Sequence, residues 1–124
     1  HDGVVALTRH IPHLAAWTLM DVAMREGSSH ERPGLVWDLA AGSWRDATRV
    51  AAADPELWTS ILQHNGGPIT SLLDDWIGTL QRVRDGIARA SPDVLQGGPH
   101  GVDATAIARQ RRRIRAKLPP IRRR

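Results

Sequence analysis

Two arginines four residues apart, Arg45 and Arg49, are the side chains of this 124-residue chain best suited to bind an anion. At that spacing both guanidinium groups leave the same face of a helix. A guanidinium is planar, stays charged and fits a carboxylate through two parallel hydrogen bonds. Arg49 is therefore the candidate carboxylate clamp. An internal ion pair with Asp46 or Asp54 is the alternative that the residues leave open.

Two histidines, His10 and His13, lie three residues apart and would share one face of a regular helix. Pro12 lies between them and removes the backbone hydrogen bond to the carbonyl of Thr8, at a cost of about 3 kcal/mol in a helix interior. Because the proline is unfavourable there, we expect the kink that it causes to have a function, such as directing the imidazole of His13 into a cleft. The alternative is a pair of hydrogen-bonded core or interface histidines. No carboxylate lies nearby in sequence to complete a zinc site, so no metal is predicted.

Trp58 and Gly42 flank the arginine segment. Asp54 and Pro55 are a helix-capping residue and a first-turn proline, so a new helix is expected to start there and to carry Trp58. Trp58 then either lines an anion site or packs in the core. Gly42 either lets a ligand approach the backbone closely or ends the preceding turn. We expect Arg49 and His13 to converge on one carboxylate-sized hollow.

Hydrophobic residues recur at helical spacing along nearly the whole chain, and no alternating run of β-branched residues predicts a strand. The predicted fold class is all-α, a helical bundle. The clearest helix is expected over 69–90 with Pro68 in its first turn. A second long helix is expected over 4–25, with Asp2 as N-cap and Gly27 as its stop. It is apolar on most sides, which a chain of this size can hardly bury, so a partner subunit is expected.

Shorter helices are expected between these two: a turn or two around 35–41, the arginine helix from Arg45, and the helix after Asp54. Loop signals stand at 27–29 and 65–67. The predicted organisation is a helical domain over 1–96, followed by a segment over 97–124 with a glycine- and proline-rich break, a last helix over 103–117 and a basic tail.

Charge is unevenly spread, since residues 1–108 carry 8 arginines and 13 acidic residues, while 109–124 carry nine basic residues and no acid. A run of that density usually forms a solvated segment. Nucleic acid or another polyanion is the less favoured alternative, and its binding would depend steeply on salt. No aromatic residue is interleaved to stack on bases. A non-enzymatic helical dimer with a polyanion-binding tail is accordingly the rival function.

The chain has no cysteine, which excludes a disulfide framework and leaves the cytoplasm as the default compartment. Charged residues, histidines and a proline interrupt its longest apolar run, over 4–24, so no membrane-crossing helix is predicted. The sequence starts at His1 without a basic leader or cleavage site. It is interpreted as cut from a longer protein rather than as a targeted precursor.

Two motifs together resemble the helical domain of prephenate dehydrogenases. His1-Asp2 and the run R-H-I-P-H over 9–13 are similar to the family's H-D and S-H-L-P-H, which open its first long helix. The segment 41–58 is similar to G-G-F-R-D-x-T-R-I-A-x-S-D-P-x-x-W, with Trp44 for the phenylalanine. The resemblance covers roughly the first ninety residues.

The resemblance implies a homodimeric domain that binds prephenate or arogenate, the substrates of an oxidative decarboxylation in tyrosine biosynthesis. By this match Arg49 corresponds to the arginine that binds a substrate carboxylate, and His13 to a histidine that contacts substrate. Gly42 and Trp58 correspond to lining positions. Arg9 replaces the family's serine, at a position that reaches toward the neighbouring subunit's site.

His10, Arg45 and Asp46 are expected to have structural roles or to hold the substrate-binding residues in position. NAD or NADP, which accepts the hydride in this family, has no expected site in the chain, because no G-x-G-x-x-G follows a predicted strand. The resemblance places the cofactor site and the catalytic histidine in an N-terminal domain outside this sequence. No catalytic residue is expected here, and the 124-residue piece is predicted to be inactive alone.

Overall fold

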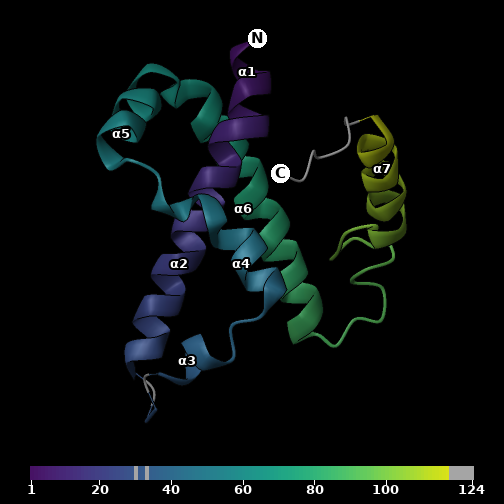
Figure 1. Cartoon of the computed structure of the whole chain (residues 1–124). Helices are drawn as coiled ribbons and strands as arrows, with labels where there is room; N and C mark the ends of the chain where they lie inside the picture. The colour runs from purple at the N-terminus through teal and green to yellow at the C-terminus, as the bar shows by residue number, and fades with distance from the viewer. Residues whose placement is uncertain (30, 33, 118–124) are drawn as a thin grey trace. The chain divides into compact units, whose positions relative to one another are not determined.

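The computed structural model describes residues 1–29, 31–32 and 34–117, and most of these residues are helical (Figure 1). No strand occurs among them, and one isolated antiparallel bridge pairs Gln96 with Asp103. The all-α prediction is confirmed. The chain divides into two compact units, His1–Asp74 and Asp75–Arg124, so the division falls within a long helix. The boundary expected at 96–97 stays a prediction.

The first long helix is continuous from Asp2 to Ser29 but changes geometry on the way. It consists of α1 (Asp2–Val5), a π-helical turn η1 (Ala6–His10) and α2 (Ile11–Ser29). In the π turn the Ile11 N–H bonds back to the Ala6 carbonyl, five residues earlier. The widened turn immediately precedes Pro12, which has no N–H to donate. The kink predicted at the proline is thus taken up by one π-helical turn.

Both predicted ends of this helix were wrong. Asp2 lies inside the first turn, and His1 holds the N-cap position without a side-chain hydrogen bond. Gly27 does not stop the helix but is buried within its last turn. The helix runs on to Ser29, and the hydroxyls of Ser28 and Ser29 donate to carbonyls of the preceding turn.

Two short helices follow, α3 (Leu35–Asp38) and α4 (Gly42–Thr48), and α4 continues into a 3-10 turn η2 (Arg49–Ala52). The arginine helix therefore begins three residues before the expected start. At its end Thr48 has φ −108° and ψ −2°, which breaks the regular α-helical path between Arg45 and Arg49. Arg45 and Arg49 therefore lie on two different helical elements, α4 and η2, and their shared face stays a prediction.

The helix predicted after Asp54 is confirmed as α5 (Pro55–His64), with an aspartate Oδ1 accepting the Glu56 N–H at 3.0 Å. Only Asn65 separates it from α6 (Gly66–Ala88). The loop expected over 65–67 was wrong, because both glycines there adopt the helical path. Two residues after α6, Ala90 adopts a left-handed conformation with φ 52°, and the Ser91 N–H bonds back to the Gly86 carbonyl at 2.9 Å.

The second unit continues from α6 into a folded-back loop and α7 (Ala104–Lys117). A Cβ on Gly86 would lie 2.5 Å from the His100 carbonyl oxygen, so the loop packs directly on the helix. Asp103 caps α7 through an Oδ1 that accepts the Ala106 N–H at 2.8 Å. The helix predicted over 103–117 is confirmed. Pro119 and Pro120 lie outside the described residues.

The first unit has a small core and a large apolar surface. Ala6 and Ala16 are fully buried, and Trp58, Ile69 and His10 nearly so. The first long helix, from Asp2 to Ser29, leaves five large apolar side chains more than a third exposed: Val4, Leu7, Leu19, Val22 and Met24. Within residues 1–29, 31–32 and 34–117, no helix has the length and apolarity needed to cross a membrane.

Candidate functional site

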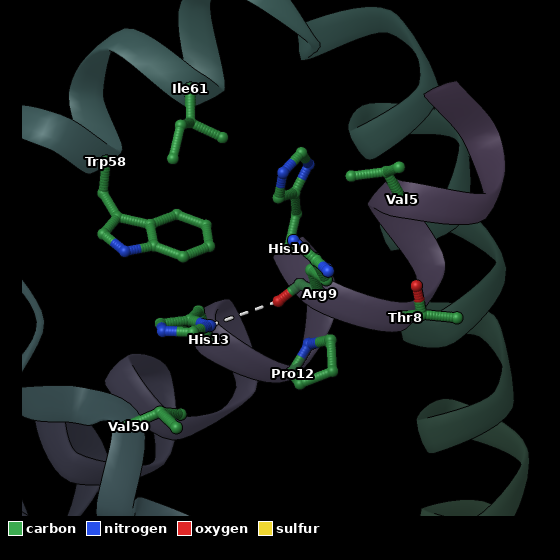
Figure 2. A pocket seen from close by; sticks show the side chains of 9 residues that line it. All are labelled: Val5, Thr8, Arg9, His10, Pro12, His13, Val50, Trp58 and Ile61. Atoms are coloured by element: carbon green, nitrogen blue, oxygen red, sulfur yellow. Dashed lines mark hydrogen bonds between the residues drawn. The ribbon is translucent and has the colours of Figure 1, made fainter. Parts of the chain in front are cut away.

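The π turn and the start of α2 form one wall of a hollow of about 450 Å³ in the first unit (Figure 2). Facing it are Val50 on η2 and two residues of α5. We call it the histidine hollow, and its lining residues are Val5, Thr8, Arg9, His10, Pro12, His13, Val50, Trp58 and Ile61. Its volume lies in the range of about 300–1,000 Å³ that small-molecule sites occupy.

Trp58, on α5 at the facing wall, is only 6% exposed. His13 stacks on it, with ring centroids 4.0 Å apart and planes inclined by 27°. His10 meets it edge-on at 5.6 Å, and Trp17 does so at 5.4 Å. The Trp17 indole N–H donates to the Ala51 carbonyl at 2.7 Å, which ties α2 to η2. The aromatic cluster thus holds both imidazoles in defined orientations.

The two histidines have different hydrogen-bond partners. His13 Nδ1 lies 3.2 Å from the Arg9 carbonyl oxygen (Figure 2). Since a carbonyl only accepts, Nδ1 carries the proton and Nε2 remains as the second polar atom of that ring. His10, only 8% exposed, has its Nδ1 3.1 Å from the side-chain nitrogen of Asn65. His10 is therefore both a buried, hydrogen-bonded histidine and a residue that lines the hollow.

Arg9 supplies the positive charge of the histidine hollow. Its side chain belongs to an exposed residue, and no acidic group of the described residues forms an ion pair with it. An unpaired guanidinium beside an apolar, aromatic wall favours an anionic ligand with an apolar body. No cluster of three metal-binding side chains occurs in the part of the chain that the structure describes.

The predicted convergence of Arg49 with His13 is not observed. Arg49 is exposed and is not among the residues that line the histidine hollow, whereas its neighbour Val50 is. The 3-10 turn that begins at Arg49 brings Val50 to the wall instead. Neither alternative ion pair, with Asp46 or Asp54, forms among the described residues. The role of Arg49 as a carboxylate clamp stays a prediction.

Arg45 lies at a second hollow, of about 600 Å³, which it shares with three tryptophans and two methionines. We call this the tryptophan hollow, lined by Trp17, Met20, Asp21, Met24, Trp37, Trp44, Arg45, Thr48, Ala51 and Ala52. Asp46 and Gly42 are both exposed and line neither hollow. An added Cβ on Gly42 would meet nothing within 4 Å, so no close approach within this chain requires that glycine.

Sequence reasoning missed several residues of the site. Trp17 could have been found, because it lies one helical turn after His13. Val5, Val50 and Ile61 are plain apolar positions that carry no chemical signal. Asn65 stands in an apparent loop signal, and only the structure shows that its amide contacts His10.

The first unit is thus a helical domain with a hollow that Arg9, His10 and His13 line together. It also leaves many large apolar side chains exposed. Residues 1–97 match the family model described as the prephenate dehydrogenase dimerization domain. The chain belongs to this family. That assignment agrees with the motif resemblance over 1–13 and 41–58.

Individual relatives agree with the family assignment. The chain is 40% identical over 95 residues to a cyclohexadienyl dehydrogenase of Zymomonas mobilis, covering 77% of this chain and 32% of that protein. It is 39% identical over 84 residues to a prephenate dehydrogenase of Bacillus subtilis, covering 68% of this chain and 22% of that protein. The chain therefore spans about a third or less of these relatives.

A solved structure is similar as well. A crystal structure of a proposed prephenate dehydrogenase from Corynebacterium glutamicum superposes with a TM-score of 0.76 at 34% identity. The match covers 96% of this chain and 34% of that one. The fold is therefore that of one helical part of a longer enzyme chain.

The described residues do not fit NAD or NADP. Dinucleotide sites of this kind need a strand, a glycine-rich turn and a helix N-terminus, and no strand occurs in residues 1–29, 31–32 and 34–117.

Proposed function

We propose that this chain is the substrate-binding and dimerisation domain of a prephenate or arogenate dehydrogenase of tyrosine biosynthesis. The observation that carries the proposal is the stacking of His13 on the buried Trp58 at the wall of a hollow with one unpaired arginine, in a chain of this family. Prephenate and arogenate both combine a ring with carboxylate groups. Such ligands suit an apolar, aromatic wall beside a cation.

Each residue of the site has a proposed role. Trp58 is the wall against which the ligand packs, and His13 is a polar group that orients it. Arg9 binds a carboxylate at the hollow. Arg49, next in sequence to the lining residue Val50, is the clamp for a carboxylate that extends beyond the hollow. Holding the ligand in one orientation is the contribution that such groups make to a reaction completed elsewhere.

The parent reaction oxidises the substrate, whose hydride passes to NAD or NADP while its carboxylate leaves as carbon dioxide. A separate dinucleotide-binding domain supplies that cofactor chemistry. The present chain is inactive alone. It works as a homodimer, in which a second copy covers the exposed apolar side chains of the first long helix.

Calorimetry with prephenate and arogenate tests this proposal on the 124-residue chain. One ligand is expected to bind per protomer, and Arg9→Ala is expected to weaken binding about 10- to 100-fold, because a hydrogen bond to a charged group contributes about 1.5–3 kcal/mol. Arg32→Ala is the matched control, since Arg32 is also an exposed arginine but lines neither hollow. Absence of binding to either ligand, or equal losses in both variants, would contradict the proposal.

A polyanion-binding tail is the second candidate, and one observation favours it. Every residue of α7 from Ala106 onward is exposed, including Arg109, Arg111, Arg112, Arg113, Arg115 and Lys117. No ion pair involves them among the described residues. Unpaired basic residues of this kind bind phosphates through counterion release. This property would accompany the ligand-binding function rather than replace it.

A further inference from the structure

Asn65 links two parts of the first unit that are far apart in sequence. It is the single residue between α5 and α6. Its side-chain nitrogen lies 3.3 Å from the Asp2 carbonyl oxygen and 3.1 Å from His10 Nδ1. One NH2 group therefore contacts both the start of the first long helix and the end of its π turn.

These two contacts determine which atom of the His10 ring carries the proton. A backbone carbonyl only accepts hydrogen bonds, so the Asp2 oxygen requires the NH2 end of the Asn65 amide on its side. The same NH2 group faces His10 Nδ1, which must then accept. A neutral imidazole that accepts at Nδ1 carries its proton on Nε2. The opposite amide orientation would set two oxygens against each other at Asp2.

The His10 Nε2 atom is then left as a donor. Among the described residues no buried side-chain nitrogen or oxygen lacks a partner, and Asn65 is the partner found for His10. Nε2 therefore reaches accessible space, although the residue as a whole is only 8% exposed. Figure 2 shows the ring beside Ile61 and Trp58 in the histidine hollow.

We propose that Asn65 is a positioning residue that holds His10 in the Nε2–H form, so that the histidine hollow offers a fixed hydrogen-bond donor to its ligand. The ligand then carries an oxygen with a free lone pair, such as a carboxylate or hydroxyl oxygen, opposite His10. His13 has the other tautomer, with its proton on Nδ1 bonded to Arg9. The identity of that ligand rests on the proposed function, whereas the tautomer does not.

Long-range proton–nitrogen NMR on the 15N-labelled full chain tests the tautomer directly. His10 should show the Nε2–H pattern, while His13 and His64 show the Nδ1–H pattern, since the His64 Nδ1 lies 2.7 Å from the Ser60 carbonyl. His10→Gln assigns the signals by their loss. A wild-type His10 in the Nδ1–H form would overturn the inference.

Two substitutions of Asn65 give the causal test. Asn65→Asp replaces the donor by an acceptor, so the His10 proton should move to Nδ1. Asn65→Leu removes the donor without supplying an acceptor, so the two tautomers should mix. The patterns of His13 and His64 should stay unchanged and report correct folding. If one variant does not fold, the other and the wild-type pattern decide, and an unchanged Nε2–H pattern in a folded variant would overturn the inference.

Prephenate affinity separates this inference from the proposed function. Asn65→Leu should weaken prephenate binding about tenfold, while Gln63→Leu should not, because it removes an exposed amide in the last turn of α5 that lines neither hollow. Wild-type affinity in Asn65→Leu, with mixed His10 tautomers, would overturn the positioning role. If prephenate binds to none of these proteins but the tautomers respond as expected, the hydrogen-bond inference stands and the proposed function fails.

Discussion

His13 stacks on Trp58 with ring centroids 4.0 Å apart, and Trp58 itself is only 6% exposed. The imidazole therefore rests on a rigid support rather than on a mobile side chain. The hydrogen bond of its Nδ1 to the Arg9 carbonyl holds the ring as well, so stacking and hydrogen bonding together restrict its rotation. A ligand that contacts His13 meets a group already held in place, which lowers the entropy cost of binding.

Replacing Trp58 by alanine should destabilise the first unit by about 3–5 kcal/mol, the range for truncating a large buried aromatic. The change removes the surface on which His10, His13 and Trp17 pack. Urea unfolding measures the loss, and Trp58→Phe should restore a large part of it. Alanine at Trp44, a half-buried tryptophan of α4, serves as the matched control. A smaller loss for Trp58→Ala than for Trp44→Ala would contradict the central role of Trp58.

Replacing Pro12 by alanine should separate stability from ligand binding. Alanine supplies the missing N–H and permits a regular α-helix through the π turn, so stability should be kept or raised by up to about 1 kcal/mol. The ring positions of His10 and His13 would shift, and prephenate affinity should fall about tenfold. Thermal unfolding and calorimetry measure the two effects. Unchanged affinity would show that the π turn does not set the geometry of the hollow.

Removing the cap of α5 should destabilise the wall that carries Trp58. Asp54 accepts the Glu56 N–H at 3.0 Å, and loss of such a cap costs about 0.5–2 kcal/mol. Asp54→Ala should lower the urea midpoint accordingly, whereas Asp54→Asn or Asp54→Ser should retain most of the stability. Asp46→Ala, which removes an exposed aspartate without a hydrogen bond to a helix end, is the control. Equal effects of Asp54→Ala and Asp46→Ala would refute the capping role.

Duplex DNA should bind the chain weakly and only at low salt. The described basic residues of α7 number six, and each phosphate neutralised adds about 0.9 to the slope of log affinity against log salt. Changing Arg111, Arg112, Arg113 and Arg115 to glutamine should abolish this binding without altering prephenate affinity. Fluorescence anisotropy over a salt series measures it. Binding that persists in the glutamine variant would show that another surface is responsible.

The helical elements could be predicted from the sequence because apolar spacing and capping residues act locally. The Asp54 cap, the last helix from Asp103 and the long helix after Pro68 are all found near their expected positions. Helix ends next to glycine were predicted less well. Helix α2 continues through Gly27, and Gly66 begins α6 with only Asn65 between it and α5, so neither glycine interrupts helical structure, in which it costs only about 1 kcal/mol.

The candidate site could be predicted only in part, for a different reason. His13, His10, Trp58 and Arg9 carry chemical signals in the sequence, and the structure brings them together. Which atom of an imidazole carries its proton depends on Asn65, 55 residues away along the chain from His10. The position of Arg49 depends on a single 3-10 turn, which residue types alone did not indicate.

The π turn changes the register of the first long helix. A turn with i to i−5 bonding is equivalent to one residue inserted into an α-helix, and one residue corresponds to about 100° of rotation. The stretch after Ile11 is therefore out of phase with the stretch before Ala6. The histidine hollow takes its lining from both sides of this shift, Val5 before it and His13 after it, whereas Leu19 and Val22 further along the helix remain exposed.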